Sequence, residues 1–276
     1  MNPILKDVFD KSVAHYRGDA RVLGAWVYGS VNHESQDQYS DVDPMFLIRD
    51  EAFEAIDREM PDLFKGWCGR IDLWWPEGFN GDKVRNYTIL FPGEGDRLLQ
   101  YDVNFMKSSA LDEEFGRSFL SRCRPEQILF DPTGRLGEVL RTAPRTPPGS
   151  DRLAWFIEKY WLYAFISTKY FARSDIFKLI YACNEMFGTH MEILLRRYGK
   201  PSTGWWATNI KQFPKDVQGE LKIYFGPPEL GSIREGFFRQ MDLFARDARA
   251  ACERHGIAYP AAVEQRIRRH IGATVG

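Results

Sequence analysis

The first half of the chain alternates between helical and extended spacing of its apolar residues. From Leu5 to Tyr16 they recur at three- and four-residue steps, which predicts an amphipathic helix. Residues 22–28, VLGAWVY, are rich in β-branched and aromatic side chains and stop at a Gly-Ser pair, so they predict a buried strand entering a turn. Residues 41–48, DVDPMFLI, predict a second strand, and helical spacing follows over 53–64.

Three further extended segments complete this half of the chain. Residues 70–75, 87–91 and 98–106 have the composition of strands. The acidic, Gly-rich turn GEGD at 93–96 separates the last two and favours an antiparallel hairpin. We therefore expect a mixed sheet with flanking helices, in the α/β (α+β) class.

The second half of the chain has helical spacing alone. It follows RTAPRTPPGS at 141–150, a segment rich in Pro, Thr, Gly and Ser that is typical of a semi-rigid connection between domains. Asp175 is a suitable N-cap for one of the helices, and Gly199 is a suitable stop. We expect a sheet domain over residues 1–145 and an all-helical domain over 151–276. The helices are predicted near 153–165, 176–187, 215–224, 233–256 and 261–271.

The composition narrows the class of partner. Of the 276 residues, 44% are hydrophobic and 27% charged, which is ordinary for a soluble globular protein. Lys and Arg total 37 against 38 Asp and Glu, so no overall field would attract nucleic acid or an anionic membrane. Charges near the N-terminus exclude a secretory apolar region, and no apolar run is long enough to span a bilayer. We expect a cytoplasmic protein with a small-molecule partner, and the sequence gives no indication of its oligomeric state.

The residues with the clearest chemistry lie in YGSVNHESQDQYSDVDPMFLI, residues 28–48. Residues two apart on a strand point to one face, so Asp41 and Asp43 would present both carboxylates to the same small volume. Their repulsion requires a compensating cation, and oxygen ligands beside triphosphate oxygens suit octahedral Mg²⁺, as one ion or two. The pattern predicts a magnesium site for a nucleoside triphosphate.

The Gly-Ser pair extends this prediction. Gly29 would let the backbone approach the phosphates closely, while the hydroxyl and N–H of Ser30 would donate to the β- or γ-phosphate, with pyrophosphate as the leaving group. Gly-Ser and Asp-x-Asp are each common in turns, so the prediction depends on their order between two strands. Pro44 cannot donate to a strand ladder, so the second strand must begin there, bulge, or leave that side unpaired.

A hydroxyl that attacks phosphorus must lose its proton, so a general base is required. Asp102 lies in the strand-like run LLQYDVNFM, and a neighbouring antiparallel strand would carry this third carboxylate to the metal site, as base or as metal ligand. Asp72 in GRIDLWW is the alternative, since it also lies centrally in a strand-like run. We favour Asp102 because of its placement relative to the motif.

Three charged residues of the helical half are further candidates. Arg173 and Lys178 would contact triphosphate oxygens, and Glu185 would face an amine of the acceptor. Cations at such positions more often belong to a solvated surface, and Glu185 would otherwise lie on the exposed side of its helix.

The segment YGSVNHESQDQYSDVDPMFLI resembles the signature of the polymerase-β-type nucleotidyltransferase superfamily, and it is especially similar to antibiotic nucleotidyltransferases that act on lincosamides and aminoglycosides. RLLQYDVNFM resembles the strand that bears the third acid in aminoglycoside 6-adenylyltransferases, and ILFDPTGRL and the helical half are similar to the same family. The resemblance implies that Gly29 and Ser30 hold the triphosphate, that Asp41 and Asp43 hold the metal, and that Asp102 is base or third ligand. Pro44 departs from the usual apolar residue.

Together these features predict a nucleotidyltransferase domain followed by a helical substrate-binding domain. The predicted reaction is magnesium-dependent transfer of AMP from ATP to a hydroxyl of an aminoglycoside or lincosamide, which would confer antibiotic resistance. An RNA or protein acceptor is one alternative, and the near-neutral charge argues against RNA. A non-catalytic nucleotide-binding or antitoxin-like module is the other, and the presence of three acids argues against it.

Overall fold

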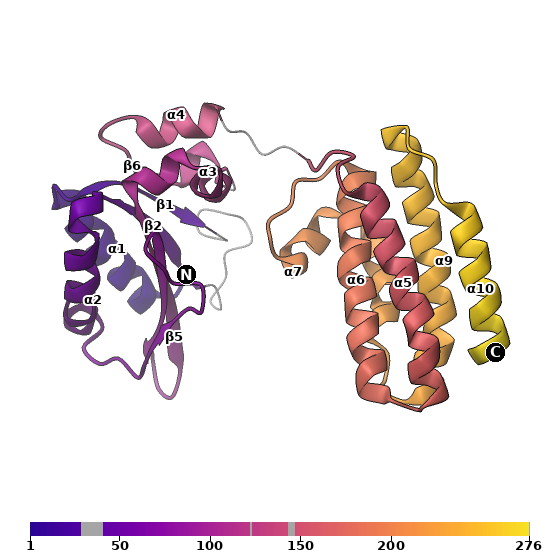
Figure 1. The fold of residues 1–276 in the computed structure, drawn as a ribbon. Coiled ribbons are helices and arrows are strands. Elements are labelled where there is room, and N and C mark those ends of the chain that lie inside the picture. The colour runs from indigo at the N-terminus through magenta and orange to yellow at the C-terminus, as the bar shows by residue number, and fades with distance from the viewer. Residues whose placement is uncertain (29–40, 122, 143–146, 276) are drawn as a thin grey trace. The chain divides into compact units, whose positions relative to one another are not determined.

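The computed structural model describes residues 1–28, 41–121, 123–142 and 147–275. The chain divides into two compact units, Met1–Arg145 and Thr146–Gly276. Figure 1 shows that the described strands all belong to the first unit and that the second unit is built from helices. The predicted fold class, a mixed-sheet region followed by a helical region, is confirmed.

The described part of the first unit consists of a six-stranded sheet with helices on both faces. The strands are β1 (Val22–Tyr28), β2 (Asp43–Ile48), β3 (Leu73–Pro76), β4 (Val84–Pro92), β5 (Leu98–Lys107) and β6 (Ile128–Phe130). The α-helices are α1 (Pro3–Gly18), α2 (Phe53–Cys68), α3 (Glu114–Leu120) and α4 (Arg135–Thr142). Short 3₁₀ helices occupy Asp50–Ala52, Ser108–Asp112 and Pro125–Gln127.

The strand order is β3-β4-β5-β2-β1-β6. Only the central pair, β2 with β5, is parallel, and the other neighbouring strands are antiparallel. β4 and β5 form the hairpin predicted from the GEGD turn. β6, which the sequence did not predict, pairs with β1 at Ala25 and Trp26 and forms the last strand of the sheet.

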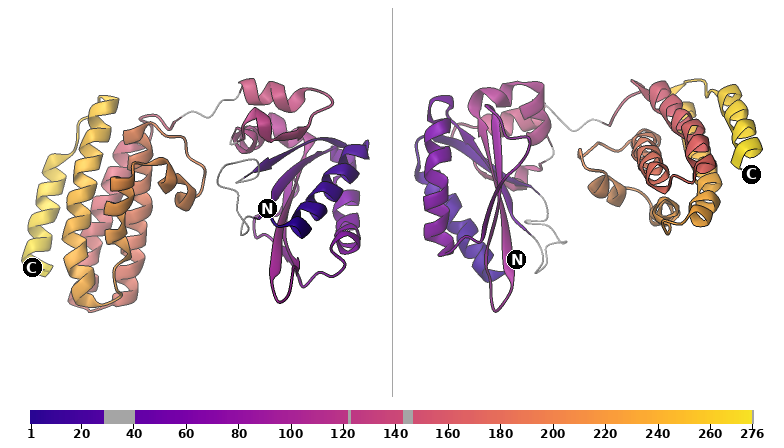
Figure 2. Two further views of the ribbon diagram at one scale, coloured as in Figure 1. Left: turned by 180° about the vertical axis from the view of Figure 1, so that it is seen from behind. Right: turned by 60° about the horizontal axis from the view of Figure 1, so that its bottom comes forward.

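Alternating side chains of the central strands enter two hydrophobic cores. Phe46 of β2 and Phe105 of β5 pack against α1 and α2 on one face of the sheet. Met45 of β2 and Met106 of β5 belong to the core that includes α3 and α4 on the other face. The views in Figure 2 show these helices on the two sides of the sheet. Successive residues of a strand point to opposite faces of the sheet. The position of an acid along β2 or β5 therefore decides which of the two faces its side chain is on.

Pro44 is the second residue of β2, where it lies opposite Val27 of β1. Pairing with β5 begins one residue later, at Met45 opposite Asn104. The residue without an N–H therefore precedes the ladder with β5, which is the arrangement expected of a strand that begins at this point.

The second unit contains helices, and no strand, among its described residues. Asp175 caps α6 as predicted, since its side chain accepts a hydrogen bond from the amide of Lys178 at 3.2 Å, and Gly199 ends this helix with φ of 60°. Among the described residues no helix is both long and apolar enough to cross a membrane. The helices are α5 (Leu153–Ala172), α6 (Ile176–Tyr198), α7 (Trp206–Asn209), α8 (Lys215–Glu220), α9 (Leu230–His255) and α10 (Ala261–Val275), with 3₁₀ helices at Ile210–Gln212 and Leu221–Phe225 (η5).

A buried polar network joins α5, α6, α9 and η5. The ring of His190 on α6 lies 2.9 Å from the carboxylate of Asp247 on α9, and both side chains are fully buried. Its other nitrogen lies 3.0 Å from the hydroxyl of Tyr224, which lies 3.2 Å from the hydroxyl of Tyr160. Burial lowers the pKa of His190 although Asp247 favours its charged form. The network holds Tyr224 in one position at the edge of the helical core.

Candidate active site

The predicted acids come together at neighbouring positions of two strands. The amide of Asp102 on β5 donates to the carbonyl of Val42 at 2.9 Å, so Asp102 lies beside the segment that contains Asp41 and Asp43. The expected antiparallel direction is wrong, because β5 is antiparallel to β4 but parallel to β2. The chain passes through α2, β3 and β4 between β2 and β5, and a crossover of that length returns it to the same end of the sheet.

Strand alternation places the acids on one face. Asp43 shares its face with Met45 on β2, and Asp102 shares that face with Met106 on β5. Val103, next to Asp102, points into the opposite core. The acids therefore lie on the sheet face that α3 and α4 cover, near the N-terminal end of β2.

Asp41, Asp43 and Asp102 form an acidic cluster, in which one carboxylate oxygen of each lies within 4.8 Å of the others. Burial raises the pKa of Asp41, and the charge of Asp102 raises it further. Burial also raises the pKa of Asp43 well above its ordinary value, and repulsion from Asp41 and Asp102 adds to this effect. Three carboxylates at this separation, partly removed from water, require a positive charge to be stable in their ionised form.

The two oxygens of Asp102 have different surroundings. Oδ2 accepts a hydrogen bond from the side-chain amide of Gln100 at 2.7 Å. Oδ1 is buried and has no hydrogen-bond partner among the residues that the structure describes. Gln100 was not among the predicted site residues, although it lies two positions before Asp102 and therefore on the same face of β5. That two-residue spacing was the signal available in the sequence.

Asn104 holds the backbone beside the acids. Its amide nitrogen donates to the carbonyl of Asp102 at 3.0 Å and to the carbonyl of Pro44 at 3.3 Å. Its amide oxygen accepts from Asn86 of β4 at 2.6 Å. Three strands are thus tied together next to the cluster by buried side chains, which limits the movement of the acids relative to one another.

The donor set of the acidic cluster fits a hard divalent cation. The cluster consists of aspartates alone, and carboxylate oxygens are the ligands that Mg²⁺ prefers, whereas zinc sites use His and Cys more often. The unpartnered Oδ1 of Asp102 provides an oxygen that no protein donor occupies in the described part of the chain. Asp41 and Asp43, with Asp102 as a third ligand or as a base, are the residues that would hold such an ion.

Two of the predicted site residues, Gly29 and Ser30, lie outside the described residues. Asp72, the alternative third acid, is not part of the cluster, and its carboxylate instead forms an ion pair with Arg70 at 2.8 Å. The structure therefore places Asp102, and not Asp72, beside the Asp-x-Asp pair.

The candidates of the helical unit make local contacts. Arg173 follows the end of α5 and is exposed. Lys178 forms an ion pair with Asp175 at 3.2 Å, and Glu185 forms one with Lys159 at 2.8 Å. The roles of Arg173, Lys178 and Glu185 in nucleotide or acceptor binding remain predictions.

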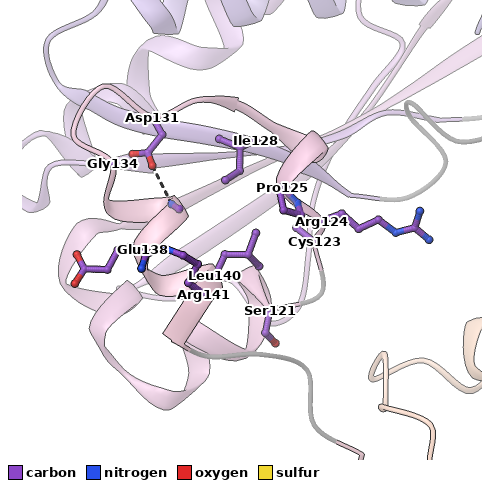
Figure 3. A pocket seen from close by; sticks show the side chains of 11 residues that line it. Ser121, Cys123, Arg124, Pro125, Ile128, Asp131, Gly134, Glu138, Leu140 and Arg141 are labelled. Atoms are coloured by element: carbon purple, nitrogen blue, oxygen red, sulfur yellow. Dashed lines mark hydrogen bonds between the residues drawn. The ribbon is translucent and has the colours of Figure 1, made fainter.

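A separate cavity of about 670 Å³ lies beside β6 and α4 in the first unit. Figure 3 shows Ile128 and Leu140 among its lining residues, and Asp131 turned toward α4, where it accepts from the amide of Gly137 at 2.9 Å. None of the predicted site residues that the structure describes lines this cavity. The cavity is therefore distinct from the acidic cluster.

No protein-family model matches the chain, and no curated protein matches it. Among solved structures, the chain is similar to the crystal structure of an aminoglycoside 6-adenyltransferase from Bacillus subtilis. The two share 14% sequence identity with a TM-score of 0.45, over 97% of this chain and 96% of that chain. The chemistry of this chain is accordingly inferred from its own acidic cluster.

Proposed function

We propose that the chain transfers AMP from ATP to a hydroxyl of a small molecule, with magnesium, and releases pyrophosphate. The observation that carries this proposal is the acidic cluster on β2 and β5, where Asp41, Asp43 and Asp102 approach within 4.8 Å and Asp102 keeps one unpartnered oxygen. Phosphoryl chemistry requires mainly positioning and charge compensation from a protein, and a rigid cluster of acids on a sheet supports both.

In this proposal Asp41 and Asp43 hold the ion, which when bound offsets negative charge on the phosphate oxygens. Asp102 is oriented by Gln100 through Oδ2, and in this scheme its carboxylate takes the proton of the acceptor hydroxyl. The acceptor oxygen forms a bond to the α-phosphorus as the bond to pyrophosphate breaks, and the proton passes to Asp102. Gly29 and Ser30 bind the triphosphate in this scheme, as the sequence resemblance implies.

The helical unit is assigned the binding of substrates. Arg173 and Lys178 are proposed to contact the nucleotide, and Glu185 an amine of the acceptor. Lys178 and Glu185 each have a neighbouring partner, Asp175 and Lys159, that a substrate group would have to replace. The acceptor class, an aminoglycoside or a lincosamide, is supported by the resemblance of the Asp-x-Asp segment and of the strand that carries Asp102.

The test is magnesium-dependent pyrophosphate release from ATP, measured against a panel of aminoglycosides and lincosamides. Asp102→Asn should lower turnover by at least about 100-fold, the scale of a lost general base. Asp41→Asn should lower it by a similar factor, because it removes a ligand of the ion. Asp72→Asn is the matched control, because Asp72 is a strand-proximal acid outside the cluster, and its turnover should stay within about twofold of the wild type.

Turnover with one acceptor that both cluster variants abolish would establish the reaction and identify the substrate. ATP binding without turnover on any panel member would overturn the small-molecule acceptor. RNA binding with a steep dependence on salt would then favour a nucleic-acid acceptor. Equal turnover by wild type and Asp102→Asn would remove Asp102 from the proposed role.

A further inference from the structure

The sheet face that carries the acidic cluster is only partly covered by α3 and α4. The core that includes these helices contains Val84 of β4 and Met106 of β5, and no described residue of β3. Farther along the same face, Trp75 of β3 and Leu98 of β5 are each 55% exposed, and Leu73 of β3 is 42% exposed. The acidic cluster therefore lies beside an open part of the sheet face, which extends over β3, β4 and β5.

Trp75 lies in register with Asp102 on this open face. Trp75 pairs with Thr88 of β4, and Thr88 pairs with Asp102 of β5. Directly opposite residues of neighbouring strands point to the same face, so the three side chains form a row, and the Cα atoms at its two ends are about 10 Å apart, two strand spacings. Trp74, the residue before Trp75, packs into the core on the other face, as this alternation requires.

The middle of the row is accessible. Thr88 is partly exposed, and its hydroxyl forms no hydrogen bond with another residue in the described part of the chain. The row therefore has an exposed indole ring at one end, a carboxylate at the other and a free hydroxyl between them.

Glu77 adds a negative charge beside Trp75. Its amide donates to the carbonyl of Asn86 at 3.1 Å, so the pairing with β4 continues past Pro76 and directs Glu77 to the same face as Trp75. Its carboxylate is partly exposed and forms no ion pair with a described residue. In β2, β3, β4 and β5, which lie wholly within the described residues, no residue directed to this face is Lys or Arg. The open face therefore attracts cations and repels anions.

These side chains select a ligand by its chemistry. The face of an indole ring packs against the C–H groups of a saturated ring and attracts an ammonium group. Glu77 is suited to pair with an amine, and the hydroxyl of Thr88 to bond a hydroxyl of the ligand. A triphosphate is anionic and would be repelled by Glu77, so the nucleotide does not fit this surface.

We propose that Trp75, Glu77 and Thr88 form the binding surface for the acceptor, and that the acceptor is a hydroxylated ring compound with several amines, as aminoglycosides are. The assignment to the acceptor rests on the proposed function, in which Asp102 takes the proton of the acceptor hydroxyl. The open face then holds the acceptor ring beside that carboxylate.

The test measures binding separately from turnover. The probes are neamine, an aminoglycoside of two rings with amines, and maltose, a sugar of two hydroxylated rings without amines. Each is titrated into the full chain by calorimetry, with magnesium present to occupy the acidic cluster and without ATP. Neamine should bind at least about fivefold more tightly than maltose, because only neamine pairs with a carboxylate.

Two variants remove the proposed contacts. Trp75→Leu should weaken neamine binding by about fivefold, the scale of one cation–π contact at an exposed site, and Trp75→Phe, which keeps an aromatic ring, should recover part of this loss. Glu77→Gln should weaken it by about fivefold and bring its affinity closer to that of maltose. All three positions are partly or fully exposed, and thermal unfolding verifies that each variant is folded.

The matched controls lie elsewhere in the same unit. Phe115 on α3 is an aromatic residue that is 46% exposed, and Glu94 is an exposed acid in the turn between β4 and β5. Phe115→Leu and Glu94→Gln should bind neamine within about twofold of the wild type.

The outcomes separate this inference from the proposed reaction. Absence of neamine binding, or equal binding by wild type, Trp75→Leu and Glu77→Gln, would overturn the inference, whereas pyrophosphate release with another acceptor would still support AMP transfer. Neamine binding that depends on Trp75 and Glu77, without pyrophosphate release, would support the binding surface and overturn the reaction. Where an acceptor is turned over, Trp75→Leu should raise its KM by about fivefold and leave the KM for ATP unchanged. A raised KM for ATP alone would assign Trp75 to the nucleotide and overturn the inference.

Discussion

Within the acidic cluster, the pKa of Asp43 is raised the most, so its ionised form is the least favourable of the three. Burial and the charges of Asp41 and Asp102 all raise its pKa. Asp43→Asn removes one of three mutually repelling carboxylates, so without metal the variant should be more stable than the wild type, by about 1–2 kcal/mol. Urea unfolding in the presence of EDTA measures this difference.

The control for this prediction is Asp72→Asn. Asp72 lies outside the cluster and has Arg70 as a partner, and its replacement should change the free energy of unfolding by less than about 0.5 kcal/mol. A decrease in the stability of Asp43→Asn would mean that Asp43 contributes a favourable contact, and the view of the cluster as a site of repulsion would be wrong.

We propose that Gln100 positions Asp102, because its side-chain amide donates to Oδ2 of Asp102 at 2.7 Å. Gln100→Met keeps the length of the side chain but removes the donor, and partners of this kind typically contribute 10- to 100-fold to metal affinity or activity. We expect pyrophosphate release to fall by about tenfold and the magnesium concentration for half-maximal rate to rise. The free energy of unfolding should be little changed. An unaltered magnesium dependence would exclude this role for Gln100.

At the scale of elements, α3 packs very closely against the 3₁₀ helix Ser108–Asp112. A Cβ at Gly116 would lie 2.0 Å from the carbonyl oxygen of Ala110, and backbone atoms cannot move aside as a flexible side chain can. Gly116→Ala should therefore destabilise the first unit by about 1–3 kcal/mol, in spite of the better helix propensity of alanine. Urea unfolding is again the measurement.

Gly188 in α6 is the matched control, since no described atom outside its own stretch of helix lies within 4 Å of the position of its added Cβ. Gly188→Ala should stabilise the protein by about 0.5–1 kcal/mol, because alanine loses less backbone freedom in a helix. If both variants lose stability equally, the close approach at Gly116 is not the cause.

The elements that the sequence predicts well are those with a long periodic pattern. β1, β2, β5 and the long helices α5, α6 and α9 follow from apolar spacing, and the cap at Asp175 follows from residue type. α3, α4 and β6 were not predicted. β6 has three residues, too few for a two-residue period to be recognised, and it is stabilised by pairing with β1 far away in sequence.

The site could be predicted only in part for a similar reason. The proximity of Asp41 and Asp43 follows from their spacing along one strand, whereas that of Asp102 depends on strand order, which local patterns do not determine. The parallel direction of β5 relative to β2 results from the whole connection through α2, β3 and β4. The role proposed for Gln100 depends on its hydrogen bond to Asp102, and the only signal for it in the sequence is its two-residue spacing from Asp102.

At the scale of the whole molecule, we expect low pH to destabilise the second unit through protonation of His190. Its ordinary pKa is 6.5, and burial lowers this value in the folded state. Below pH 6.5 the unfolded chain therefore binds a proton at His190 that the folded chain does not bind. The stability contributed by neutral His190 is complete above pH 6.5, and it is lost as the pH falls toward the pKa of the folded state. The free energy of unfolding of the second unit should decrease between pH 7.5 and pH 5.

The measurement is urea unfolding at a series of pH values, followed by the fluorescence of tryptophan in each unit. His190→Gln removes the titrating group and should flatten the dependence of the second unit on pH, at a cost in stability at pH 7.5. His15→Gln, an exposed histidine of the first unit, should leave that dependence unchanged. A second unit whose stability is constant over this range would contradict the prediction.

The pairing of β6 with β1 has a consequence for the synthesis of the protein on the ribosome. β1 is made early and finds β2 soon afterwards, but its other edge has no partner until Ile128–Phe130 has left the exit tunnel. During this interval the nascent chain presents an open strand edge, which is a template for pairing with another chain. A shortened gene that stops after β5 would make this interval permanent, and its product would be prone to aggregation.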